Sequence, residues 1–195
     1  MLVDAAQVKS RRDRLKKALR EHGSLLGILF GSLLVLMVLG PYVNWDAEVE
    51  YQAAIGVVKW GFPYITFGNL VNQPPLGYYI DALFFKTLGL SYSTGVGAIT
   101  FFGLGSILLV YEIGKVFYDK QTGLLAAAVF GLTPWQAIMS RIFLIDTQCL
   151  FFSLLYLLVG VLAIQRRSYS LLFVSGALRL LLYVPGPLLL NPDSI

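Results

Sequence analysis

Acidic residues gather in two short stretches of an otherwise apolar chain. The stretch "NWDAEVEY" contains Asp46, Glu48 and Glu50, and the stretch "MSRIFLIDTQCLFFSLL" places Arg141 five residues before Asp146. Carboxylates at a membrane surface can serve as a general base or as metal ligands. The two stretches can form one site only if they lie on the same side of a membrane, so the helices that position them must be found first.

Composition indicates a membrane protein. Hydrophobic residues make up 57% of the chain and charged residues only 13%, about half the charge of a typical soluble domain. Apolar runs of about 20 residues predict helices that span a bilayer. We therefore expect the all-α class, a polytopic helical membrane protein with about five transmembrane helices. The predicted spans are Ser24–Val43, Ser93–Gly114, Thr122–Met139, Thr147–Ile164 and Leu171–Leu190.

The positive charges predict the topology. Seven of the fifteen Lys and Arg residues lie within residues 9–20, which marks the cytoplasmic flank of the first span. If residues 76–90 lie in the membrane interface, eleven cations are cytoplasmic and three are outside. If this segment crosses the membrane instead, the excess of cytoplasmic Lys and Arg becomes smaller. We expect a multi-pass protein of the cell membrane with a basic cytoplasmic N-terminal segment, 1–23, a helical membrane domain, 24–195, and an outer loop, 44–92.

The outer loop contains signals for two interfacial helices. A helix over residues 46–60 is predicted, with Asn44 or Asp46 as its N-cap and Gly61 as its stop. The stretch "GFPYITFGNLVNQPP" is expected to be irregular, and a second helix covers residues 76–90, after the Pro-Pro pair. On the first helix Asp46 shares a face with Glu50, four residues on, and not with Glu48.

Single residues exclude several classes of site. Cys149 is the only cysteine and His22 the only histidine, so an intrachain disulfide, a Ser-His-Asp triad and a zinc-histidine site are excluded. The acids have plainer interpretations too. The first stretch could simply place charge at a helix N-terminus, and Arg141 with Asp146 could be an interfacial ion pair. Two acidic sites and an arginine at one membrane level, among Tyr, Trp and Asn, favour a site for a polar ligand.

Four stretches, in order, resemble the N-terminal half of the GT-C membrane glycosyltransferases, in the branch related to protein O-mannosyltransferases and lipid A aminoarabinose transferases. They are "NWDAEVEYQAAI", "NQPPLGYYIDALF", "LLVYEIGKVFYDKQTGLLAAAVFGLTP" and "MSRIFLIDTQCLFFSLL". The resemblance covers about residues 25–165. It implies a polyprenyl- or dolichyl-phosphate sugar as donor, used at the outer membrane face, and a glycan, lipid or protein hydroxyl as acceptor.

The resemblance also implies roles for individual residues. Asp46 would be the leading general base, with Glu48 as its competitor, because Ala47 separates two acids that are adjacent in the family. Asp146 would be the second acid, which binds the acceptor, orients the site or binds a divalent metal, and Arg141 would contact phosphate. The other expected substrate-binding residues are Tyr51, Asn72 and Arg179.

The chain departs from the family in length. Family members run beyond twice this length, and this sequence stops at "LLLNPDSI". We therefore expect either a fragment or a chain whose module a second chain completes. The alternatives to an enzyme are a non-catalytic membrane scaffold, a transporter-like subunit or an inactive remnant. Transporters place polar residues at mid-membrane and show internal repeats, whereas the acids here gather at one interface.

Overall fold

The computed structural model describes residues 5–65 and 73–183, and for residues 5–21 and 181–183 the backbone alone. Throughout these ranges every regular element is an α-helix, which confirms the predicted fold class. The helices are α1 (Ala5–Leu39), α2 (Trp45–Trp60), α3 (Leu76–Leu88), α4 (Tyr92–Phe117), α5 (Lys120–Leu132), α6 (Pro134–Met139), α7 (Asp146–Gln165) and α8 (Tyr169–Tyr183).

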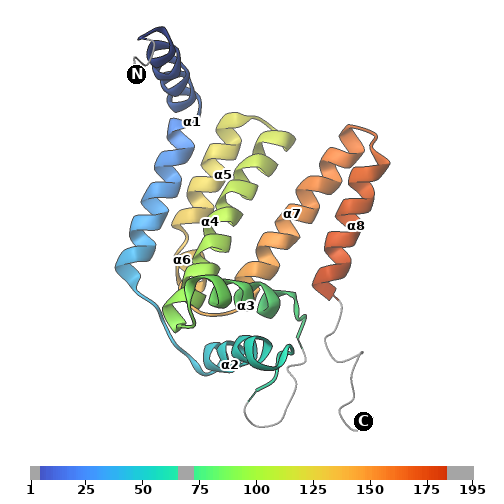
Figure 1. The fold of residues 1–195 in the computed structure, drawn as a ribbon. Coiled ribbons are helices and arrows are strands. Elements are labelled where there is room, and N and C mark those ends of the chain that lie inside the picture. The colour runs from blue at the N-terminus through green and yellow to red at the C-terminus, as the bar shows by residue number, and fades with distance from the viewer. Residues whose placement is uncertain (1–4, 66–72, 184–195) are drawn as a thin grey trace.

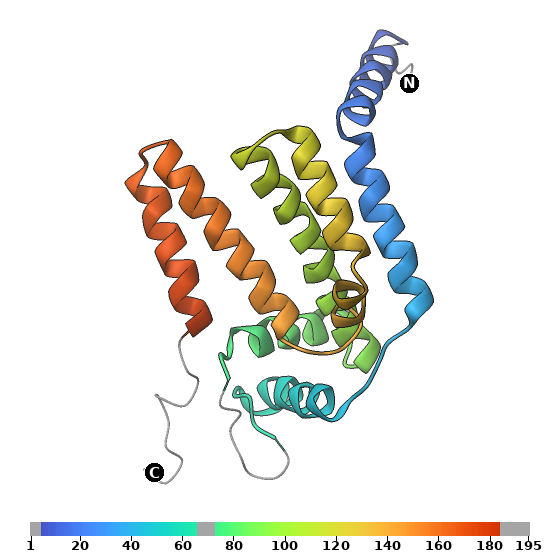
Figure 2. The same ribbon diagram turned by 180° about the vertical axis from the view of Figure 1, so that it is seen from behind.

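The long helices run side by side, and two shorter ones lie across one end of them. Figures 1 and 2 show α1, α4, α5, α7 and α8 along one direction, with α2 and α3 transverse at the end opposite the N-terminus of α1. Helix α4 packs on both α5 and α7, α7 packs on α8, and α3 packs on both α2 and α4. The segment 140–145, between α6 and α7, lies at the same end as α2 and α3. We call this end the acidic end.

Within the described residues, three helices have the length and apolar character to cross a membrane. They are α4, α7 and the part of α1 from His22 to Leu39. Helix α8 is a shorter apolar helix within the described residues. Helix α1 runs without a break through the predicted boundary at residue 23. The chain is thus an all-α membrane protein, and the number of five spans stays a prediction.

One predicted span is wrong as a single helix. Residues 122–139 form α5 and α6, separated at Thr133, whose backbone is extended (φ −65°, ψ 127°). The cause is Pro134, because a proline disfavours helical backbone at the residue before it and fits well at the first position of a new helix. Helix α5 alone is roughly 20 Å long. The predicted last span, 171–190, is described only to residue 183, within α8.

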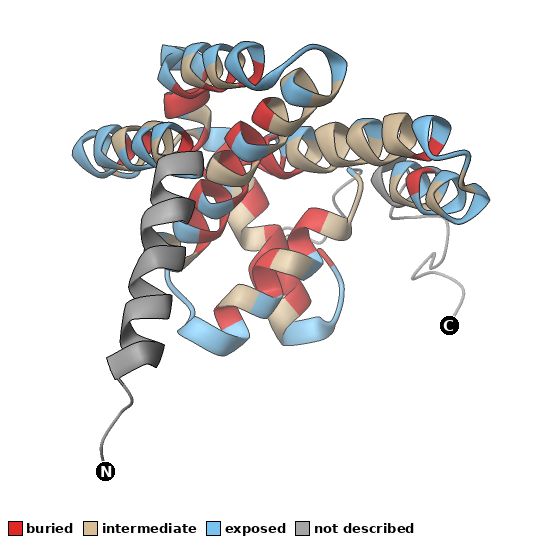
Figure 3. Ribbon diagram, turned by 90° about the horizontal axis from the view of Figure 1, so that it is seen from above, coloured by how far each residue is buried: buried red, intermediate tan, exposed pale blue. Residues whose placement is uncertain are grey.

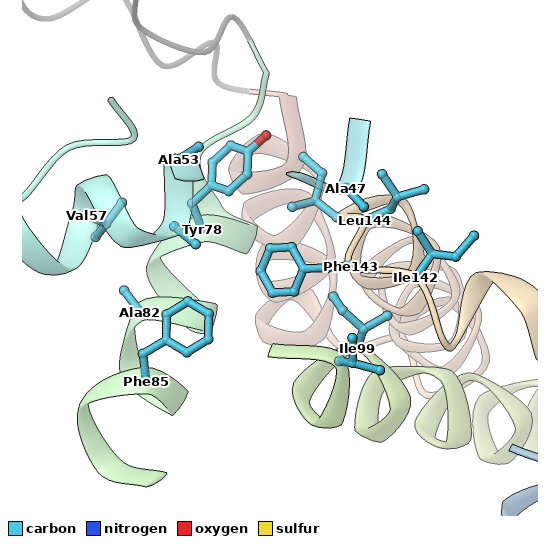
Figure 4. Packing of buried hydrophobic residues seen from close by; sticks show 13 residues of the cluster. Ala47, Ala53, Val57, Tyr78, Ala82, Phe85, Ile99, Ile142, Phe143 and Leu144 are labelled. Carbon is cyan, nitrogen blue, oxygen red and sulfur yellow. The ribbon is translucent and has the colours of Figure 1, made fainter. Parts of the chain in front are cut away.

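The principal core lies at the acidic end. Its buried side chains come from α2, α3, the start of α4 and the segment 140–145. Seen from above, buried residues gather in the middle of the molecule, and α7 and α8 extend away from it with mostly partly buried or exposed residues (Figure 3). Phe143, which is fully buried, lies among Tyr78 and Phe85 of α3 and Ile99 of α4 (Figure 4). The core thus joins the two stretches that carry the acids.

Candidate active site

Helix α2 starts and ends where its local signals predict. The Asn44 side chain accepts a hydrogen bond from the Ala47 N–H at 2.7 Å, and Gly61 ends the helix in the left-handed conformation (φ 83°). This cap places Asp46 and Glu48 in the first turn, where negative charge is favourable beside the helix dipole. Both carboxylates are exposed.

The segment 140–145 is fastened to the chain that precedes α2. The Tyr42 N–H donates to the Arg141 carbonyl at 3.0 Å. The Arg141 side chain donates through Nε to the Gly40 carbonyl at 3.0 Å and through Nη1 to Thr100 Oγ1 at 3.4 Å. The bonds to Gly40 and Tyr42 join residues about 100 positions apart, so the two acidic stretches lie side by side.

Arg141 and Asp146 do not form the ion pair considered as an alternative. An ion pair elsewhere joins Lys115 to Glu112 at 3.0 Å, near the opposite end of α4 from the acidic end. The Arg141 guanidinium instead holds the backbone of the first stretch. Asp146 begins α7 with an exposed side chain.

Glu50 is the carboxylate that connects the two stretches, and it was not among the predicted site residues. It is buried, and its Oε2 atom accepts a hydrogen bond from the Ile145 N–H at 2.7 Å. Burial, together with the nearby carboxylates of Asp146 and Asp46, outweighs the lowering effect of the Ile145 bond and raises the pKa of Glu50 to about 7. Three carboxylates from α2 and α7 therefore share one region.

A second buried carboxyl group belongs to α3. Asp81 is fully buried, and its Oδ1 atom accepts a hydrogen bond from Gln148 Nε2 of α7 at 2.7 Å. Burial raises the pKa of Asp81 to about 8, and the Glu50 carboxylate raises it too. Gly77 allows this approach, because a Cβ atom there would lie 2.4 Å from Gln148 Oε1.

Tyr51, a predicted substrate-binding residue, lies in an aromatic cluster beneath the acids. Its ring makes edge contacts with Phe85, Tyr92 and Phe143 at centroid distances of 5.6, 5.3 and 5.6 Å. Burial raises the pKa of its phenol, and the charge of Glu48 adds to this. The cluster gives α2 a rigid attachment to α3, α4 and the segment 140–145.

The remaining predicted residues are exposed or lie outside the described residues. Glu48 accepts a hydrogen bond from Gln52 Nε2 at 2.8 Å on the exposed side of α2. Arg179 is exposed on α8, which packs on α7. Asn72 lies outside the described residues. Asp146 was considered as a metal ligand, and the described part of the chain contains no group of three or more His, Cys, Asp or Glu side chains that could hold a metal ion.

Comparison with known proteins identifies the family. Residues 72–181 match the family described as dolichyl-phosphate-mannose-protein mannosyltransferase. The match spans more than half of the chain, from α3 to α8. The chain belongs to this family. This mannosyltransferase family is of the GT-C type, so the predicted resemblance is confirmed. Asp81, Arg141 and Asp146 lie inside the matched range, and the acids of α2 precede it.

A curated relative supports the same assignment over part of its length. The protein "Putative mannosyltransferase YycA" of Bacillus subtilis (strain 168) is 27% identical over 133 residues, which cover 63% of this chain and 19% of that protein. The chain thus spans about a fifth of the length of this relative. No solved structure matches the chain significantly.

Proposed function

We propose that this chain is part of a glycosyltransferase that moves a sugar from a polyprenyl- or dolichyl-phosphate donor to an acceptor hydroxyl at the outer membrane face. Family membership supports sugar transfer, and the family name specifies a dolichyl-phosphate-linked mannose. The acceptor is a glycan, a lipid or a protein. The N-terminus is cytoplasmic, and a second chain or a further part of the protein completes the module.

The observation that carries the proposal is the convergence of acids from two distant stretches. Asp46 lies in the first turn of α2 and Asp146 begins α7. Both act electrostatically on Glu50 of α2, whose side chain accepts from the Ile145 N–H just before α7. Asp46 and Asp146 are exposed, so a substrate can reach them. A ligand that contacts both helices would meet two carboxylates at one end of the bundle.

In the proposed reaction, Asp46 is the general base. Its carboxylate takes the proton of the acceptor hydroxyl as the hydroxyl oxygen attacks the anomeric carbon of the donor sugar. The bond from that carbon to the phosphate oxygen breaks, and the lipid phosphate leaves with the electron pair. Glu48 is the competing base, and Asp146 binds and orients the acceptor.

Arg141 is proposed to bind the leaving phosphate. A guanidinium has five N–H donors, and Arg141 uses Nε and Nη1 for the protein contacts that the structure describes. The remaining donors suit a phosphate, whose developing charge must be offset as the bond breaks. Further substrate contacts are proposed for Tyr51, Asn72 and Arg179.

A scan of carboxylates in the full chain tests the proposal. Asp46→Asn, Glu48→Gln and Asp146→Asn are made singly, and transfer is measured in membranes from a radiolabelled polyprenyl-phosphate mannose. We expect Asp46→Asn to lower the rate on the order of 10²- to 10⁴-fold, because a missing general base costs about that much. If Glu48 is the base instead, the larger loss appears in Glu48→Gln.

The matched control is Glu112→Gln on α4. Glu112 is an exposed carboxylate whose partner is Lys115 of the same helix, and its substitution should leave the rate unchanged. Transfer that survives all three substitutions at the acidic end would contradict a catalytic role and leave the scaffold interpretation.

A further inference from the structure

Two buried carboxyl groups meet the start of α7 without a cation. Glu50 of α2 accepts from the Ile145 N–H, and Asp81 of α3 accepts from Gln148 Nε2, both at 2.7 Å. Neither carboxyl group forms an ion pair with any described residue. Two ionised carboxylates in one apolar core would repel each other and lose hydration, so at least one of them is expected to keep its proton.

The hydrogen-bond donors differ between the two groups. Glu50 receives the Ile145 N–H, and the Gln73 side chain, which accepts from the Tyr78 hydroxyl, lies close enough to lower the pKa of Glu50. Asp81 receives one donor, from Gln148. Because hydrogen bonds from donors stabilise the ionised form of a carboxyl group, Glu50 is the better place for the negative charge.

Two buried atoms without hydrogen-bond partners also favour a proton on Asp81. Asp81 Oδ2 and Gln148 Oε1 are buried acceptors that have no hydrogen bond to any described group. An unpaired buried acceptor is costly, and an ionised Asp81 supplies no donor to either atom. A proton on the Asp81 carboxyl group supplies the one donor that this pair lacks.

We propose that Asp81 is a protonated carboxylic acid and that, with Gln148 and Glu50, it positions the first turn of α7 against α2 and α3. Asp81 and Gln148 fasten α3 to α7, and Glu50 fastens α2 to the residue that precedes α7. Asp146, which lies between Ile145 and Gln148 in the chain, is thereby held opposite Asp46. The positioning of Asp146 deepens the proposed function and rests on it. The proton on Asp81 does not depend on the proposed function.

Other titratable groups surround the pair. Asp46 of α2 and Asp146 of α7 face Glu50, and Tyr78 of α3 lies near both buried carboxyl groups, with Cys149 of α7 also close to Tyr78. None of them is a cation at neutral pH. Burial raises the pKa of both Glu50 and Asp81, which agrees with a proton held by this pair at neutral pH.

Infrared spectroscopy of the full chain in detergent tests the proton directly. Near neutral pH, the wild-type protein should show the carbonyl band of a buried carboxylic acid, and Asp81→Asn should lose it. The amide of this variant can accept from Gln148 Nε2 and donate to Gln148 Oε1, so the fold should be kept. Glu112→Gln, which changes an exposed carboxylate, is the control and should leave the band unchanged.

Thermal unfolding of the same proteins gives a second readout. Both pKa values are raised in the folded state, so the folded protein holds these protons more tightly and loses stability as the pH rises from about 4 to about 8. Asp81→Asn and Glu50→Gln should each make this decline in melting temperature smaller. In transfer assays Asp81→Asn should keep the rate within about tenfold of wild type, because it removes no catalytic group.

The proposal is overturned if the wild-type protein lacks the carboxylic acid band, or if Asp81→Asn keeps the band or leaves the decline in melting temperature unchanged. A wild-type spectrum without the band overturns the proposal even if Asp81→Asn does not fold. A protein that shows the band but transfers no sugar would contradict the proposed function alone.

Discussion

The acidic end and the pair α7–α8 use their side chains in opposite ways. At the acidic end, α2, α3 and the segment 140–145 bury both apolar and polar groups against the start of α4. The long helices bury a smaller share of their apolar residues as they leave this end. In α4, 56% of the apolar window is buried, and in α7 only 17%. A surface left apolar and exposed suits lipid, whereas a buried polar network requires a fixed geometry. The difference indicates that the acidic end is the part built for accurate positioning.

The largest loss of stability should come from filling the contact between α3 and α7. Gly77→Val would place methyl groups where a Cβ atom alone already lies 2.4 Å from Gln148 Oε1 and 2.7 Å from Ile145 Cγ2. We expect a loss of about 3 kcal/mol in unfolding free energy, because overpacked cores cost up to about this much. Gly97→Val is the control, since nothing lies within 4 Å of that position. Equal stability of the two variants would contradict the close packing described for α3.

A smaller effect is expected where Arg141 holds the two acidic stretches together. Arg141→Ala removes the bonds to the Gly40 carbonyl and to Thr100, and we expect unfolding free energy to fall by about 2 kcal/mol, the range for hydrogen bonds from a charged donor. Arg166→Ala, at an exposed position after α7, should change stability little. Chemical denaturation in mixed micelles measures both. A loss no greater than that of Arg166→Ala would mean that Arg141 does not connect the stretches.

The smallest effect should come from the exposed ion pair of α4. Glu112 and Lys115 pair at 3.0 Å, with side chains 41% and 44% exposed. Glu112→Gln should cost at most about 0.5 kcal/mol, because solvent and salt screen such pairs. The cost should shrink further in high salt. If Glu112→Gln lowered the unfolding free energy as much as Arg141→Ala does, an exposed ion pair would stabilise the protein as much as the hydrogen bonds of the acidic end.

Sequence alone predicted the local features of the acidic end. The Gly61 stop and a cap at Asn44 or Asp46 follow from signals within a few residues, and the structure has Asn44. The helix predicted over residues 76–90 is present and ends at Leu88. The break at Thr133 also has a local cause in Pro134. It was not predicted because the residues on both sides form one continuous apolar run. Apolar runs report burial or lipid contact and do not show where one helix becomes two.

The buried carboxyl groups could not be found in this way. Glu50 was expected to share a face with Asp46, but its partner Ile145 lies 95 residues away. Asp81 lies within the helix predicted over residues 76–90, and its partner Gln148 is 67 residues away. Such contacts depend on how α2 and α3 dock on α7. The roles of Asp46, Glu48 and Asp146 stay predictions.

The most direct test of the account is the membrane side on which its two exposed acids lie. Asp46→Cys, Asp146→Cys and Glu112→Cys are made singly in a Cys149→Ala background, and intact cells are treated with a membrane-impermeant maleimide. The account predicts that positions 46 and 146 react from outside and that position 112 reacts only after the membrane is permeabilised. Positions 46 and 146 reacting from opposite sides would contradict the shared site at the acidic end.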